Sequence, residues 1–133
     1  MERLIRFVVQ QPHWRSGRRS GLFQATDEIL DTPDHNLRHA IEELLGWFNA
    51  NLPVPFVDAD KKNEPEWKIQ PTSQALSWTK FGAAEHVSKL RQLKVLVEEA
   101  GWLVEEIATT KPGNVLYEDD FQVVAEPFRD TLT

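Results

Sequence analysis

Four prolines interrupt the middle of the chain and limit what can fold there. Residues 53–72 are a polar run of Asp, Lys, Asn and Glu with only isolated apolar residues, and the run is broken at Pro53, Pro55, Pro65 and Pro71. Because proline fixes φ and lacks a backbone donor, neither a helix nor a central strand can pass through this segment. Neither flanking part alone would make a sizeable core. We therefore expect one domain over residues 1–133, with 53–72 as an irregular segment within it.

The part before this segment predicts one strand and two helices. Apolar residues alternate with period two over residues 3–10, which is typical of a strand, and Pro12 ends it. Ser20 has a residue type preferred at a helix N-cap, which predicts a short helix over 21–31. Thr32 and Pro33 then suit the N-cap and the first position of a second helix, over 33–51. Its core face is a stripe at helical spacing, made of Leu37, Ile41, Leu44, Leu45 and Phe48.

The part after the segment predicts one helix and four strands. A short strand is expected over 75–79, a helix from about Gly82 to residue 100, and strands over 102–109, 115–118 and 121–126. Gly113 supplies the positive φ of a turn between the second and third of these strands. The short turns predict a C-terminal three-strand antiparallel meander. The fold class is therefore α+β, with helices packed on one face of an antiparallel sheet and the order β-α-α-loop-β-α-β-β-β.

Composition and charge exclude several classes of protein. The chain has no Cys, so disulfides, thiolate catalysis and Cys-based zinc sites are excluded. A net charge of -6 repels a phosphate backbone, which disfavours general nucleic-acid binding. No apolar run approaches the roughly 18 residues of a membrane span, and charges interrupt the short apolar stretch at the N-terminus, so it is not a signal peptide. These features predict a cytoplasmic protein without membrane contact.

The first candidate binding site is a basic loop near the N-terminus. Trp14, Arg15, Arg18 and Arg19 combine cations that suit phosphate or carboxylate with a ring that can stack on a base. Its glycines match neither a Walker A loop nor a dinucleotide fingerprint, but Gly21 and the helix after it offer amide donors to an anion. The alternative is a solvated basic loop that balances the acidic body.

The second candidate is a pocket around His86, with Trp78 and Lys80. His86 lies in the middle of the apolar face of the helix that begins near Gly82, so it is either half-buried with a hydrogen-bond partner or lines a pocket. His35 and His39 have the spacing of helical zinc ligands, but a site would need a third ligand such as Glu43 or a distant carboxylate, and the sequence favours a solvated helix face. We predict no metal site and no cofactor.

Three segments together resemble a set of small bacterial proteins that have no assigned activity. They are Trp47-Phe48-Asn49-Ala50-Asn51-Leu52-Pro53-Val54-Pro55, Ala75-Leu76-Ser77-Trp78-Thr79-Lys80, and the stretch from Tyr117 to Phe128. The position of Thr79 is usually aromatic in that set, so this chain departs from the pattern there. The resemblance implies a bacterial single-domain protein. It supplies no reaction, cofactor or site.

The sequence favours a non-enzymatic binding or interaction protein that acts through the Arg/Trp loop and a Trp-bearing surface. Five Trp residues are more than one small core needs, which predicts a homo-oligomer or a protein partner. The alternative is a small enzyme with its pocket near His86, Trp78 and Lys80. A deep pocket that unites His86 with a carboxylate would favour the enzyme, whereas a flat apolar patch would favour binding.

Overall fold

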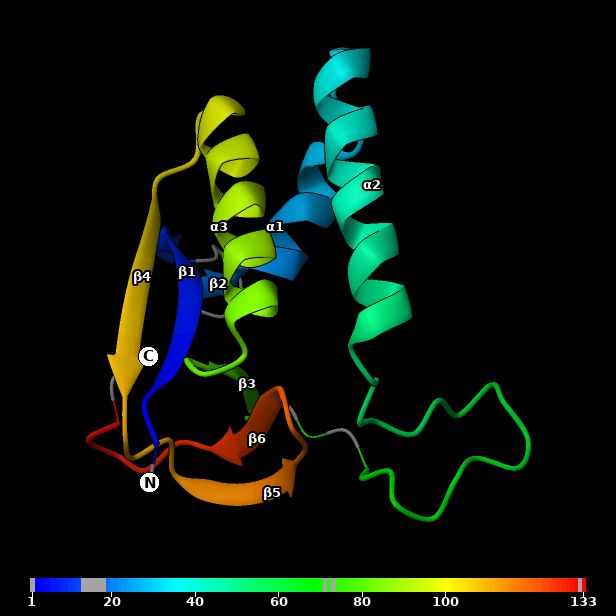
Figure 1. The fold of residues 1–133 in the computed structure, drawn as a ribbon, viewed down its shortest axis with the longest axis vertical. Helices are drawn as coiled ribbons and strands as arrows, with labels where there is room; N and C mark the ends of the chain where they lie inside the picture. Colours follow the sequence, from blue (N-terminus) through cyan, green and yellow to red (C-terminus); the bar gives the residue numbers. More distant parts are fainter. Residues whose placement is uncertain (1, 13–18, 71, 73, 132) are drawn as a thin grey trace.

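The computed structural model describes residues 2–12, 19–70, 72, 74–131 and 133. Three helices and a six-stranded antiparallel sheet form one α+β domain, as predicted (Figure 1). The elements are β1 (Leu4–Pro12), β2 (Arg19–Gly21), α1 (Leu22–Ile29), α2 (His35–Asn51), β3 (Leu76–Lys80), α3 (Ala84–Glu99), β4 (Val104–Thr109), β5 (Asn114–Glu118) and β6 (Gln122–Glu126). The predicted order is confirmed, and the three-residue strand β2 is an addition to it.

The pairing of the last three strands corrects the expected meander. β5 and β6 form a hairpin, and β6 pairs with β3, but β4 pairs with β1 at the other side of the sheet. β1 offers β4 an unbroken ladder of six residue pairs, from Leu4 with Thr109 to Val9 with Val104. The ladder of β5 is interrupted by a register shift between Val115 and Tyr117. β4 therefore lies in the long, regular ladder with β1 and does not pair with β5, although the turn before β5 is short.

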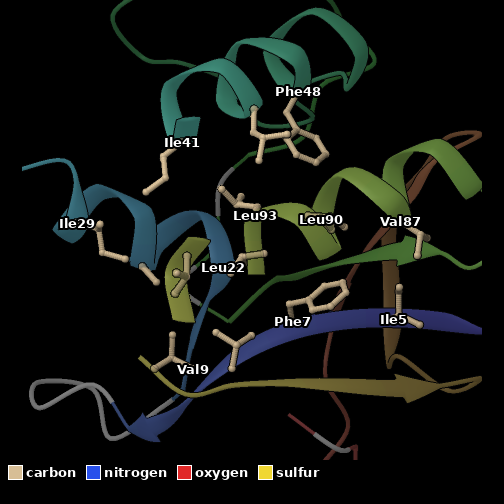
Figure 2. Close-up of a cluster of buried hydrophobic side chains, with 14 of the residues drawn as sticks. Ile5, Phe7, Val9, Leu22, Ile29, Ile41, Phe48, Val87, Leu90 and Leu93 are labelled. Atoms are coloured by element: carbon tan, nitrogen blue, oxygen red, sulfur yellow. The ribbon is translucent and has the colours of Figure 1, made fainter. Parts of the chain in front are cut away.

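The main core lies between the helices and one face of the sheet. Figure 2 shows Ile5, Phe7 and Val9 of β1 pointing toward apolar side chains of all three helices. The stripe predicted for α2 is buried in this core except for Leu45, which is partly buried. A second, smaller core occupies the opposite face of the sheet and contains Leu4, Val8, Trp78, Ile107, Val123 and Ala125. Successive residues of β1 thus alternate between two apolar environments.

The beginnings of the first two helices differ from the sequence expectation. Asp34 is the N-cap of α2, and its side chain accepts a hydrogen bond from the amide of Leu37 at 3.0 Å. Thr32, the expected cap, instead accepts a hydrogen bond from the amide of Asp34, so the helix begins two residues later than predicted. Gly21 rather than Ser20 is the N-cap of α1, and no side chain caps that helix. None of the helices in the described residues is long and apolar enough to cross a membrane.

The irregular segment after α2 is folded back on itself. The amide of Val57 donates to the carbonyl of Ile69, and the amide of Ile69 donates to the carbonyl of Pro55, both at 2.8 Å. Trp67 lies 5.9 Å from Tyr117 of β5, measured between ring centroids. The segment thus forms a wide loop that lies beside the β5–β6 hairpin (Figure 1). Its first residues, 52–55, complete the wall of a cavity.

Candidate functional site

One edge of β1 is split between two partner strands. β3 pairs with the start of β1 through Leu4 with Lys80 and Ile5 with Thr79, whereas β2 pairs with it from Val8 onward. The next pair in the register of β3 would be Arg6 with Trp78, and the strands separate at this point. Among the described residues, Arg6 and Phe7 therefore have no strand partner on this side. We call this interval the split edge.

A cavity of about 410 Å³ lies at the split edge. It is lined by β1, the first turn of α1, the C-terminal end of α2, residues 52–55 and β3. Most of the lining is apolar, with amide and hydroxyl groups added by Gln24, Asn49, Ser77, Thr79 and Gln122. Small-molecule sites are typically apolar cavities of about 300–1,000 Å³ with a few polar groups. The size and lining of this cavity fit that class.

Arg6 is the one charged side chain among the described residues that line the cavity. It is partly buried, and no ion pair or side-chain hydrogen bond joins it to any other part of the described chain. Burial, together with the nearby Arg19 guanidinium, lowers the pKa of Arg6 to about 10. Arg6 therefore remains protonated at neutral pH, as a cation with no counter-ion among the described residues.

The N-terminus of α1 lies beside this cation. A Cβ placed on Gly21 would be 3.7 Å from Nη2 of Arg6, so the guanidinium extends to the start of the helix. The first residues of α1, Leu22, Phe23 and Gln24, line the cavity, and no acidic side chain is present in this turn. The first amides of a helix lack intrahelical acceptors and carry partial positive charge. Arg6 and these amides thus give the cavity a positive end.

Trp78 is the candidate from the sequence that lines this cavity. Its side chain is fully buried, and its ring also belongs to the smaller core. Within the described part of the chain, its Nε1 has no hydrogen-bond acceptor. A buried donor without an acceptor costs about 1–3 kcal/mol. Among the described residues that line the cavity, Arg6 and Trp78 thus each carry a donor group without an acceptor.

The Arg/Trp loop is described only at its last residue, since Trp14, Arg15 and Arg18 lie outside the described residues. Arg19 donates from Nη1 to Glu105 at 2.5 Å. Its Nε and Nη2 donate to the main-chain oxygen of Thr133 at 3.0 and 2.6 Å. Arg19 is therefore neutralised by a carboxylate and does not line the cavity, although it lies close enough to influence Arg6.

Lys80 and His86 do not join Trp78 in one pocket. Lys80 lies 2.7 Å from Glu118 and 3.5 Å from Glu2, and the hydrogen bond with Glu118 raises its pKa. Nε2 of His86 donates to the carbonyl of Asn51 at 2.8 Å, which is the hydrogen-bonded alternative considered for this residue. The ring of His86 stacks on Phe121 with centroids 4.2 Å apart. Neither side chain lines the cavity.

A network around Asp119 holds the wall of the cavity. Gln122 donates from Nε2 to the carbonyl of Pro53 at 2.7 Å and to Asp119 at 3.0 Å. Tyr117 donates its hydroxyl to Asp119 at 2.7 Å. Burial by itself would raise the pKa of Asp119, but hydrogen bonds from Gln122, Tyr117 and two backbone amides lower it overall. Burial, and then the bond to Asp119, raises the pKa of Tyr117 to about 12.

The remaining sequence candidates lie at the surface or in the core. His35 and His39 are exposed on α2, with His39 3.2 Å from Glu43, and the described residues contain no group of three or more possible metal ligands. Trp47 and Trp102 pack at the margin of the main core, whereas Trp67 is about half exposed. Among the described Trp residues, Trp67 is thus the one that a partner can reach most readily.

Sequence reasoning missed Arg6, the residue with the greatest chemical interest in the cavity. The alternation over residues 3–10 places Ile5, Phe7 and Val9 on one face of the strand and Arg6 on the other, and it gives Arg6 no role. The missed signal is the pair of neighbours on that face, because Leu4 and Val8 are also apolar and are fully buried. A charge between two apolar residues of the same strand face points to a functional position.

The chain matches no family model, no curated protein and no solved structure, which is consistent with the lack of an assigned activity in the proteins that it resembles.

Proposed function

We propose that this protein binds a small organic anion with an apolar body in the cavity at the split edge. The observation that carries the proposal is Arg6, a cation in a largely apolar cavity that no described carboxylate neutralises. Removing a charge from water without a partner is unfavourable. A bound anion would offset this cost for Arg6 and so stabilise the folded protein. The guanidinium fork suits a carboxylate or phosphate group, and the apolar walls suit a hydrocarbon or aromatic body.

The chemistry of the lining supports binding rather than catalysis. The described lining residues include no His, Lys, Asp or Glu that would act as a general acid or base. The hydroxyls of Ser77 and Thr79 line the cavity, but no base beside them activates either as a nucleophile. His86, on which the enzyme alternative depended, is hydrogen-bonded to Asn51 outside the lining. The geometry thus favours the binding class of the two functions considered from the sequence.

The proposal is tested with a charged probe and its neutral counterpart. We would titrate the protein with 2-naphthoate and with 2-naphthylmethanol in a calorimeter, since the two share an aromatic body and differ in charge. We expect binding of 2-naphthoate and at least tenfold weaker binding of the alcohol. A hydrogen bond to a charged group is worth about 1.5–3 kcal/mol, so Arg6→Met should weaken 2-naphthoate by roughly 10- to 100-fold.

The control variant is Arg91→Met. Arg91 is exposed on α3 and pairs with Glu106, away from the lining of the cavity. Arg91→Met removes the same charge from the protein as Arg6→Met, so it controls for any general change in the attraction of the protein for anions. We expect its affinity for 2-naphthoate to equal that of the wild type. Absence of binding of 2-naphthoate, octanoate and phenyl phosphate at millimolar concentration, or equal losses in the two variants, would contradict the proposal.

A further inference from the structure

We infer that the anionic group recognised at the split edge is a monoanion, a carboxylate rather than a phosphate dianion. This inference rests on the proposed function and names the class of its ligand. It depends on how much positive charge the described residues place at the cavity and on how that charge is arranged.

The described residues that line the cavity carry one full positive charge. Arg6 is the one charged described residue of the lining, and Arg19, the cation that acts on Arg6 electrostatically, is already paired with Glu105. The N-terminus of α1 adds at most about half a charge, and α1 is only eight residues long. A monoanion is therefore matched, whereas the second charge of a dianion would remain largely uncompensated.

The surroundings make a second negative charge expensive. The walls are mostly apolar, so a charge without a partner there loses its hydration and gains nothing in exchange. The chain as a whole also carries a net charge of -6, so its long-range field opposes a dianion more than a monoanion. Sites that hold phosphate dianions commonly use several cations or amides together with a metal ion.

The geometry of the single cation also fits a carboxylate. Nη2 of Arg6 lies beside Gly21, where the absence of a side chain leaves the fork accessible from the helix side. A planar guanidinium binds the two oxygens of a carboxylate through two parallel hydrogen bonds. The third oxygen of a phosphate would have only neutral groups to contact, such as the hydroxyls and amides of the described lining.

The test uses one aromatic body with two anionic groups. We would measure the dissociation constants of 2-naphthoate and 2-naphthyl phosphate at about pH 5 and about pH 8. A phosphate monoester loses its second proton near pH 6, so it changes from a monoanion to a dianion across this range, whereas the carboxylate stays ionised throughout. We expect 2-naphthyl phosphate to bind at least about tenfold more weakly at the higher pH. The affinity of 2-naphthoate should change by less than about twofold. Any change in it measures the effect of titrating groups of the protein itself.

The outcomes separate this inference from the proposed function. If 2-naphthyl phosphate binds equally well or better at the higher pH, and Arg6→Met still weakens binding by at least about tenfold, the function stands and the monoanion inference is wrong. If neither probe binds, both fail. The indole N–H signal of Trp78 in a nitrogen–proton correlation spectrum locates the probe, with that of Trp102 as the distant reference. Binding that leaves the Trp78 signal unchanged contradicts the proposed function itself.

Discussion

A guanidinium without a counter-ion is unfavourable for the free protein, and this gives Arg6 a measurable signature. Replacing it by Met removes a partly desolvated charge and keeps most of its apolar stem volume. We therefore expect Arg6→Met to leave the free energy of unfolding unchanged or to raise it by about 1 kcal/mol, while it weakens anion binding. Urea denaturation checks the first part. A loss of stability larger than about 1 kcal/mol would show that Arg6 has a structural role that its described contacts do not reveal.

Asp119 has a second residue-scale signature, which depends on pH. Its carboxylate accepts hydrogen bonds from Tyr117, Gln122 and two amides, and its pKa in the folded state is lowered below the ordinary value of 3.8. An acid with a depressed pKa stabilises the fold above its unfolded pKa, and this stabilisation is lost as the pH falls through the folded pKa. We expect Asp119→Asn to lose about 2 kcal/mol at pH 7, and this loss should shrink as the pH falls below the ordinary value of 3.8. Denaturation of both proteins at several pH values measures the difference, and a constant difference across that range would contradict this account.

Single residues were the hardest to predict from the sequence. Trp78 was proposed from the sequence for a pocket with Lys80 and His86; it lines the cavity at the split edge, and the other two residues do not. Arg6 and the tie from Gln122 to Pro53 were not predicted, because both depend on contacts between segments far apart in the sequence. Spacing along one helix or strand carries no information on such contacts.

Two glycines test the elements in which they lie. Gly113 precedes β5 with φ of 121°, and a Cβ there would collide with the main-chain oxygen of Glu126. Gly46 lies inside α2, and a Cβ there would have no neighbour within 4 Å. We expect Gly113→Ala to lower the free energy of unfolding by more than about 2 kcal/mol, and Gly46→Ala to raise it by about 0.5–1 kcal/mol. Thermal denaturation of the two variants, side by side, gives opposite shifts in Tm if this is correct.

The cap of α2 provides a further comparison at the scale of elements. Asp34 accepts from the amide of Leu37, whereas Thr32 accepts from Asp34 outside the helix. Asp34→Ala should therefore cost about 1 kcal/mol, and Thr32→Ala should cost clearly less. Urea denaturation ranks the two variants. A larger loss for Thr32→Ala would indicate that Thr32, as the sequence predicted, is the N-cap of the helix.

The positions of the elements were predicted more completely than their partners. Periodicity and turn residues are local, and they placed the predicted strands and helices within a few residues of their observed bounds. The pairing of β4 with β1 depends on a ladder between residues about 100 positions apart, which local patterns do not encode. The second core could not be predicted for the same reason, because the burial of both faces of β1 becomes visible only once the strand pairing is known.

At the scale of the whole molecule, the cavity contacts elements from both sides of the irregular segment. Its lining includes β1, α1 and α2 before the segment and β3 and α3 after it. A ligand held there should therefore stabilise the entire domain and not one part of it. At a concentration of 2-naphthoate about 100 times its dissociation constant, we expect about 2.7 kcal/mol of added stability and a rise in Tm of roughly 10 °C.

Far-UV circular dichroism and tryptophan fluorescence should follow this transition at the same temperature, with and without the ligand. Arg6→Met should melt in one transition as well, but the same concentration of 2-naphthoate should raise its Tm clearly less than that of the wild type. Two separate transitions in the wild type would show that the parts before and after the irregular segment unfold independently.

The split edge also bears on how this protein can acquire new ligand preferences. Much of the cavity wall comes from residues 52–55, which belong to no strand or helix, and from side chains at the ends of α1 and α2. Substitutions at exposed positions there, such as Val54, change the shape of the cavity without altering a strand ladder or the main core. Selection or a focused mutant library can therefore exchange one apolar body for another while Arg6 keeps the requirement for an anion. The preference of the protein for ligand size can in this sense evolve separately from its preference for ligand charge.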